Sequence, residues 1–159
     1  MANDNWGHQA RFGVFIVGAE PVPEAEWWAM APSGVSIHAA RITSKTPWAT
    51  WNADHTEVGL GEDLERGARQ LAALAADVVV VGHSSSSVLG GEGWDEAVVR
   101  QLEEVIGGKT KVTTNGHDCS KALEAVGGKH PFVIIPPWFG DGFIETAREY
   151  LITQGLPPA

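Results

Sequence analysis

The sequence predicts an α/β protein with a parallel sheet of flavodoxin-like character and helices on both faces. Runs of β-branched and aromatic residues alternate along the chain with segments of helical periodicity, a pattern typical of parallel strands joined by right-handed crossovers. Residues 78–81 are four consecutive valines, as expected of a strand buried on both faces. We expect a first lobe over residues 1–108 and a partial second α/β lobe over residues 109–159.

The first half of the chain contains two expected strands, two expected helices and one long loop. Residues 12–17 form an apolar run and residues 35–42 alternate apolar and polar side chains, so both are expected strands. Residues 24–30 follow prolines and begin with acidic residues, which favours a short helix. Residues 62–76 carry the regular apolar face of an amphipathic helix. Residues 44–61 show no clear period, and their two tryptophans either cover the edge of the core or form part of a lid.

The second half repeats the alternation of strand and helix. Residues 94–106 are an expected helix that ends at a glycine pair, and residues 111–114 are an expected short strand. Asp118 is expected to cap a helix that runs to residue 126. Residues 132–135 form an expected fifth strand, halted by two prolines, and a last helix begins at residue 141 or 142.

Composition argues against several classes of partner. The formal net charge is −9 and no basic stripe is present, so nucleic acid is not an expected partner. No apolar run approaches the roughly 20 residues of a membrane helix, and the polar N-terminus lacks the apolar centre of a signal peptide. A membrane is therefore not an expected partner either. Cys119 is the only cysteine, so no intrachain disulfide can form, and a cytoplasmic location is expected.

Neither a metal nor a cofactor is expected. The six histidines lack the spacing of metal ligands, and the glycine pairs match neither a dinucleotide-binding nor a Walker pattern. Cys119 lies near the start of an expected helix, where the pKa of a thiol can fall. Most free cysteines, however, are packed and unreactive.

The valine strand ends in His83 followed by Ser84, Ser85, Ser86 and a fourth serine. Ligands of open α/β sheets bind at this carboxyl edge, so we expect the functional site here. The ordinary pKa of histidine suits acid–base catalysis near neutral pH; alternatively, His83 packs in the cleft wall and bonds a backbone carbonyl. The serine hydroxyls can bind an anion, cap the following turn, or do both.

The same residues allow a serine hydrolase as an alternative. The sequence from Gly82 matches Gly-x-Ser-x-Gly except at its last position, and this would make Ser84 the nucleophile. The missing glycine normally permits the sharp turn of that motif, and no His-Gly-Gly stretch offers an oxyanion hole. Asp118 with His130, or Asp95 with His117, supplies only the required order of acid and base.

Several segments, together with the serine segment, form a pattern that can be compared with known families. They are Gly13–Val17 with the Pro/Glu turn after it, Glu24–Pro32 with Gly34 and Val35, Asp77–Gly82 with Gly90 and Gly91, Thr113 with Thr114, and the segment that ends at Trp138. From Phe12 to about Gly155 the chain resembles the aspartate/glutamate racemase superfamily. The resemblance is greatest to its maleate cis-trans isomerase and arylmalonate decarboxylase branch.

This resemblance implies a cofactor-free isomerase, racemase or decarboxylase acting on a small (di)carboxylate by proton transfer next to the carboxylate. Ser84 and Ser85 would hold the carboxylate or its enediolate, and His83 would move the proton. Trp138 falls where arylmalonate decarboxylases carry a site tyrosine and would wall the pocket. Gly18, which begins the turn after the first strand, and Ser86 are counted with the substrate-binding residues.

The chain also departs from that pattern. His83 occupies the position of a catalytic cysteine in the isomerases and racemases, and Glu20 stands near an asparagine of the maleate isomerases. The chain is expected to lack the C-terminal part that carries the family's second cysteine. A non-catalytic carboxylate-binding or oligomer-forming relative is therefore the alternative. Since an unfinished two-lobed fold would expose an apolar face, a homo-oligomer is expected.

Overall fold

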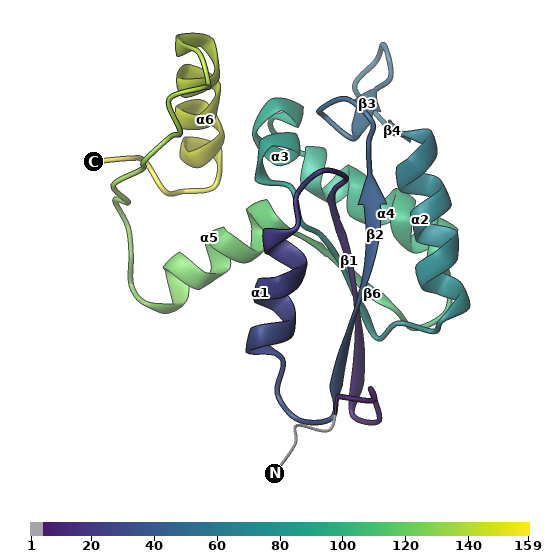
Figure 1. Cartoon of the computed structure of the whole chain (residues 1–159). Coiled ribbons are helices and arrows are strands. Elements are labelled where there is room, and N and C mark those ends of the chain that lie inside the picture. Colours follow the sequence, from purple (N-terminus) through teal and green to yellow (C-terminus); the bar gives the residue numbers. More distant parts are fainter. Residues whose placement is uncertain (1–4) are drawn as a thin grey trace.

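A parallel sheet forms the centre of the protein, as the sequence predicts, and it has four strands. The computed structural model describes residues 5–159. The strands lie in the order β2-β1-β5-β6, and all three neighbouring pairs are parallel. Figure 1 shows this sheet with helices on either side of it. The bounds of the strands are Ala10–Val17 for β1, Val35–Ile42 for β2, Val78–Val81 for β5 and Lys111–Thr114 for β6. The sheet continues across residue 108, where the boundary between two lobes was expected, because β6 pairs with β5.

Six helices and one small hairpin surround this sheet in the described part of the chain. The hairpin pairs β3 with β4 in antiparallel fashion. The bounds are α1 Val22–Met30, α2 Glu62–Ala73, α3 Ser84–Gly90, α4 Trp94–Ile106, α5 Asn115–Ala125 and α6 Asp141–Thr153, with β3 Ala49–Trp51 and β4 Val58–Leu60. None of these helices is long and apolar enough to cross a membrane.

The period of strand β1 divides the core into two layers. Val14 and Ile16 belong to one buried cluster, whereas Phe15 between them belongs to another, because successive side chains of a strand point to opposite faces. The Phe15 cluster includes α2 and α4, and the other includes Trp27 of α1. Helices therefore cover both faces of the sheet, as expected, and leave its carboxyl edge for other residues.

The segment expected to be a loop without regular structure instead contains the hairpin. Trp48 is 2 % exposed and Trp51 is half-buried. The indole N–H of Trp51 donates to the carbonyl of Gly90 at 2.8 Å, and that of Trp94 donates to the carbonyl of Ala49 at 2.9 Å. Trp51 and Trp94 thus fix the hairpin against α3 and α4, and the two tryptophans of this segment cover the edge of the core.

The expected fifth strand over residues 132–135 is wrong. This segment has no regular secondary structure, and Phe132 and Ile134 are each 83 % exposed. β6, at the end of the sheet, pairs only with β5 and so leaves its outer edge unpaired, but residues 132–135 do not add to that edge. The apolar, β-branched composition indicated a strand, but composition alone does not supply the hydrogen-bonding partner.

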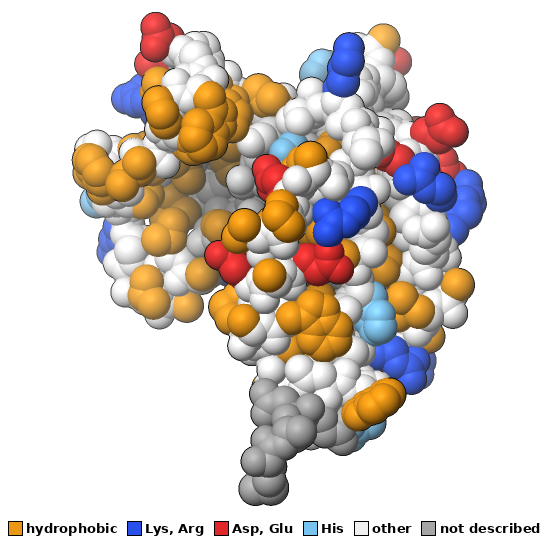
Figure 2. Space-filling view, viewed as in Figure 1, with side chains coloured by type: hydrophobic (Ala, Val, Ile, Leu, Met, Phe, Trp, Pro, Cys, Tyr) orange, Lys and Arg blue, Asp and Glu red, His pale blue; other side chains and the backbone are white. Residues whose placement is uncertain are grey.

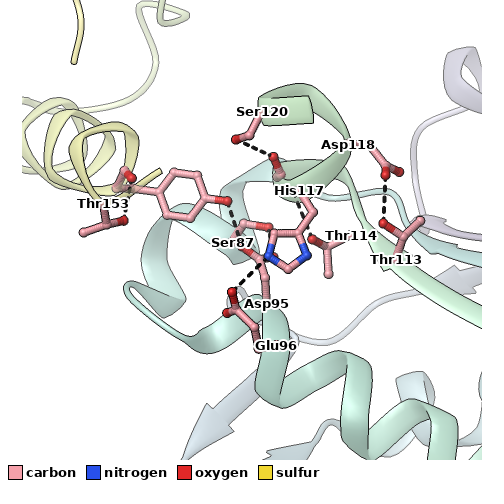
Figure 3. A network of polar contacts seen from close by, with 11 residues as sticks. Ser87, Asp95, Glu96, Thr113, Thr114, His117, Asp118, Ser120 and Thr153 are labelled. Atoms are coloured by element: carbon pink, nitrogen blue, oxygen red, sulfur yellow. Dashed lines mark hydrogen bonds and ion pairs between the residues drawn. The ribbon is translucent and has the colours of Figure 1, made fainter. Parts of the chain in front are cut away.

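The start of α5 also differs from expectation. Thr114, rather than Asp118, is the N-cap, and its hydroxyl accepts from the N–H of His117 at 3.2 Å. The carboxylate of Asp118 accepts instead from the hydroxyl of Thr113 at 2.8 Å (Figure 3). The N-cap therefore lies four residues earlier than predicted, directly at the end of β6.

A buried polar network attaches α6 to the rest of the molecule. Asp95 is 1 % exposed, and its two carboxylate oxygens accept from the hydroxyl of Ser87 at 2.6 Å and from that of Tyr150 at 2.7 Å (Figure 3). Burial, followed by the hydrogen bond and charge of Asp95, raises the pKa of Tyr150. Tyr150 is thus held as a neutral donor, and the network joins α3, α4 and α6.

Candidate active site

A small cavity of about 260 Å³ lies where strands β1, β2 and β5 end. We call it the sheet-edge cavity. None of the charged side chains in residues 5–159 lines it; its lining residues are Val17, Gly18, Ala19, Ile42, Thr43, Ser44, Thr46, Trp48 and His83. The carboxyl edge of a parallel sheet is the ligand-binding edge of such folds, so this cavity is the natural starting point for a site.

Gly18 is required on steric grounds. A Cβ at this position would lie 2.7 Å from the Cγ2 atom of Thr43 and 3.2 Å from the carbonyl oxygen of Ile42. The guanidinium of Arg41 holds the following turn by donating to the carbonyls of Gly18 at 3.2 Å and Glu20 at 3.1 Å. The side chain of Glu20 is exposed and does not line the cavity.

Asp63, in the first turn of α2, fixes the opposite wall. Its carboxylate accepts from the backbone N–H and the hydroxyl of Thr43 and from the same two groups of Ser44. Burial by itself raises the pKa of Asp63, but these four hydrogen bonds outweigh that effect and lower the pKa to about 2. The hydroxyls of Thr43 and Ser44 therefore already donate to a permanent carboxylate.

His83 lies between the cavity and the core. It is half-buried, and its ring stacks on that of Trp48 with centroids 4.3 Å apart and planes at 15°. Its Nδ1 atom lies 2.8 Å from the Oγ atom of Ser86. Because burial lowers the pKa of His83 to about 4, the imidazole is neutral near pH 7.

Ser84 and Ser85 line a second hollow, which we call the apolar groove. Its volume is about 490 Å³, and Figure 2 shows hydrophobic side chains gathered around a hollow on the side where α6 lies in Figure 1. Most of its lining is apolar; the residues are Ser84, Ser85, Val88, Gly116, Cys119, Ser120, Leu123, the segment 131–136, Phe139, Phe143, Ala147, Tyr150 and Leu151. Consecutive residues, His83 and Ser84, thus line two neighbouring hollows.

The remaining predicted residues occupy different environments. Ser86 is fully buried, and its Oγ atom accepts from the backbone N–H of Trp48 at 3.0 Å besides contacting His83. Trp138 is 78 % exposed and lines neither hollow. Cys119 borders the apolar groove, and burial together with the charge of Asp118 raises the pKa of its thiol.

Trp48 and Asp63 are among the residues of this site that escaped the sequence analysis. Trp48 belonged to a segment without a clear period, and Asp63 read as an ordinary acidic residue in a first helical turn. The signal for Asp63 was its place in a helix that follows a segment rich in Ser and Thr. Such a carboxylate can accept from loop N–H and hydroxyl groups.

The structure gives no support to the serine hydrolase. Asp95 bonds Ser87 and Tyr150, and the Nε2 atom of His117 lies 3.2 Å from a carboxylate oxygen of Glu96 (Figure 3). Asp118 accepts from Thr113, and His130 contacts the carbonyl of Pro157. Neither proposed pair of acid and base is therefore assembled at Ser84.

Known structures share this arrangement of strands and helices. No protein-family model matches the chain, and no curated relative matches it. A maleate isomerase from Pseudomonas putida S16, solved as the C200A variant with maleate, superposes with a TM-score of 0.76 at 19 % identity and covers 94 % of this chain. The chain has the maleate isomerase fold.

Two further structures support this assignment. The maleate cis-trans isomerase of Nocardia farcinica has a TM-score of 0.66 at 17 % identity, and an arylmalonate decarboxylase has 0.66 at 19 %. Each covers 94 % of this chain, whereas the chain spans 61 % of the length of each of the three. The fold expected from the sequence resemblance is confirmed, that of the aspartate/glutamate racemase type.

Proposed function

We propose that this protein is a cofactor-independent isomerase, racemase or decarboxylase that acts on a small (di)carboxylate by proton transfer next to the carboxylate. The observation that carries the proposal is the maleate isomerase fold over 94 % of the chain. A neighbour with maleate and an arylmalonate decarboxylase both have this fold. A hollow at the carboxyl edge of the sheet, with no charged lining residue, supports it.

Uncharged donors suit this chemistry. Removing a proton or CO₂ next to a carboxylate leaves negative charge on the carboxylate oxygens. Hydroxyl and N–H groups that are held in place stabilise this charge by donating hydrogen bonds to it. Ser84 and Ser85 supply hydroxyls immediately after β5. His83 enters the reaction as a neutral imidazole, since its pKa is about 4. Gly18 lets the turn after β1 approach the substrate. The wall role expected of Trp138 stays a prediction, because its exposed side chain lines neither hollow.

Proton NMR in deuterium oxide tests this proposal. The wild-type chain is incubated with maleate, aryl- and alkylmalonates and amino acids, with and without a chelator, and both product formation and α-proton exchange are recorded. We expect turnover of at least one carboxylate that the chelator does not affect. The double variant Ser84→Ala/Ser85→Ala should lower kcat/KM on the order of 100-fold, since each hydroxyl stabilises developing charge.

Thr146→Ala is the matched control for the serine variant. Its hydroxyl donates within α6 to the carbonyl of Gly142 at 2.9 Å, and Thr146 lines neither hollow. This variant should keep full turnover. An equal loss in the control and in the serine variant would show that stability, rather than carboxylate binding, had been changed.

The second candidate is a carboxylate-binding or oligomer-forming protein without turnover. Phe132, Ile134 and Trp138 are exposed, and exposed large apolar side chains favour a homo-oligomer. Binding of a carboxylate with neither exchange nor product would favour this candidate, and light scattering after gel filtration would give the oligomeric state. The cytoplasmic location, proposed from the single cysteine, is checked by cell fractionation.

A further inference from the structure

His83, Ser86 and Trp48 form a compact group beside the sheet-edge cavity. The Oγ atom of Ser86 contacts two partners, the backbone N–H of Trp48 at 3.0 Å and Nδ1 of His83 at 2.8 Å. The ring of His83 is also sandwiched against the indole of Trp48. Both the position and the orientation of this imidazole are therefore fixed by groups that belong to the core.

The hydrogen-bond inventory determines where the protons lie. A hydroxyl has one proton to donate and lone pairs that accept. The Oγ atom of Ser86 already accepts from Trp48, and Nδ1 of His83 is the only acceptor found for its proton among the described residues. Ser86 is fully buried, so water cannot accept a hydrogen bond from its hydroxyl. A hydroxyl without an acceptor would therefore lower the stability of the fold. The hydroxyl therefore donates to Nδ1, which must carry no proton.

The other ring nitrogen faces away from the core. A neutral imidazole without a proton on Nδ1 carries it on Nε2. In the described part of the chain no protein group forms a hydrogen bond with Nε2 of His83. This nitrogen is nevertheless not a buried polar atom without a partner. It is therefore open to solvent, and His83 lines the sheet-edge cavity.

From this geometry we propose that Ser86 holds His83 in the Nε2–H tautomer, so that His83 donates a hydrogen bond to a ligand oxygen in the sheet-edge cavity. Ser86 is then a positioning residue that acts through His83. The ligand group is a carbonyl or carboxylate oxygen, because the N–H of a neutral imidazole donates a hydrogen bond and therefore binds an acceptor rather than a cation. This ligand role rests on the proposed function, whereas the tautomer does not.

The tautomer changes the chemistry assigned to His83. With its proton on Nε2 and its Nδ1 lone pair occupied by Ser86, the imidazole has no free basic nitrogen with which to remove a proton from a substrate. It can stabilise negative charge on an oxygen by hydrogen bonding, with no net proton transfer. The low pKa of the imidazole supports this role, because a neutral ring keeps the same donor across the neutral pH range.

Nitrogen NMR of the full chain tests the tautomer without any substrate. In a protein labelled with ¹⁵N-histidine, long-range proton–nitrogen correlations distinguish the two neutral tautomers, and His83→Gln identifies the signals of His83. We expect the Nε2–H pattern throughout the neutral range. A pattern with the proton on Nδ1, or an equal mixture of both forms, would overturn the proposal.

Two serine variants then separate positioning from general destabilisation. Ser86→Ala removes the donor to Nδ1 and should convert the His83 signals to a mixture of tautomers. Ser87→Ala removes the neighbouring buried hydroxyl of the same helix, which bonds Asp95 instead, and should leave the pattern unchanged. An unaltered pattern in a folded Ser86→Ala protein would contradict the role of Ser86; should that variant not fold, the wild-type pattern still decides the tautomer.

Titration with maleate separates this inference from the proposed function. We expect the Nε2 and Nε2–H signals of wild-type His83 to shift on binding. An Nε2–H pattern that responds to no carboxylate of the substrate panel would overturn the ligand role and count against the proposed function, while the tautomer would stand. Turnover combined with a proton on Nδ1 would overturn only the inference.

Discussion

The sheet with its helices and the C-terminal segment after α5 are held together by different means. In the first region Phe15, Trp48 and Trp94 are at most 2 % exposed. The indole N–H groups of Trp51 and Trp94 each donate to a backbone carbonyl. In the second region Val126, Phe132, Ile134 and Trp138 are between 78 and 83 % exposed. The sheet is stabilised by burial, whereas the C-terminal segment depends on α6 and the contact of Tyr150 with Asp95.

The largest expected effect comes from removing matched phenylalanine rings from the two regions. Phe15 is completely buried and Phe132 is 83 % exposed. Phe15→Ala should lower the free energy of unfolding by about 3–5 kcal/mol, because it removes apolar burial and leaves a cavity. Phe132→Ala should change it by less than about 0.5 kcal/mol. Urea unfolding followed by tryptophan fluorescence measures both, and equal losses would refute the contrast between the regions.

The contrast also explains which parts of the fold the sequence could predict. Local patterns sufficed for β2, β6 and α4, whose observed bounds match the predicted ones, because alternation, capping glycines and an apolar face are encoded within each element. The same kind of pattern failed for residues 132–135, because a strand needs a neighbour that composition does not reveal. The apolar run there indicates that the segment could form a strand, but not whether it lies beside the free edge of β6.

Prediction of the candidate site met the same limit. The position of His83 and the serines after a buried strand was readable, since strand ends and ligand edges follow from the α/β pattern. The sequence did not show which of these residues line a hollow and which point into the core. Ser84 and Ser85 line the apolar groove, whereas Ser86 turns inward to His83 and Trp48. This arrangement depends on the short helix α3 and on Trp48, which lies 38 residues before Ser86 in the chain.

A medium effect is expected from the pH dependence of His83. Its pKa is about 4 in the folded chain and 6.5 in an unfolded one, so the unfolded state binds the proton first as the pH falls. The stability contributed by the neutral ring is complete above pH 6.5 and is lost as the pH falls toward 4. We expect a loss of about 2 kcal/mol between pH 7 and pH 5 from this group.

Urea unfolding at both pH values, compared between variants, isolates that contribution. His83→Gln should remove the pH-dependent loss of about 2 kcal/mol, whatever its effect on the absolute stability. His130→Gln is the control from the C-terminal segment, because His130 is exposed and contacts only the carbonyl of Pro157 at 3.3 Å. An unchanged slope in His83→Gln would mean that the ring is not buried as a neutral group.

Tyr150→Phe is expected to have the smallest effect on global stability. Its effect should be confined to the C-terminal segment. The substitution keeps the ring of Tyr150 and removes the hydroxyl that donates to Asp95 at 2.7 Å. Ser87 still donates to the other carboxylate oxygen, so we expect a loss of about 1–2 kcal/mol. Since this contact joins α6 to α4, the loss should appear as faster amide exchange in α6 and the segment 131–140, while β1 and β5 keep their protection.

Hydrogen exchange read by mass spectrometry resolves this pattern along the chain. Thr153→Ala is a suitable control, because its hydroxyl donates only to the carbonyl of Tyr150 within the end of α6 and does not cross to another element. Faster exchange confined to residues after 126 would show that the C-terminal segment opens as a separate unit while the sheet stays closed. Uniform acceleration over the whole chain would instead mean that the Asp95 network and the sheet form one cooperative unit, and that the difference in exposure between the two regions does not correspond to a difference in local stability.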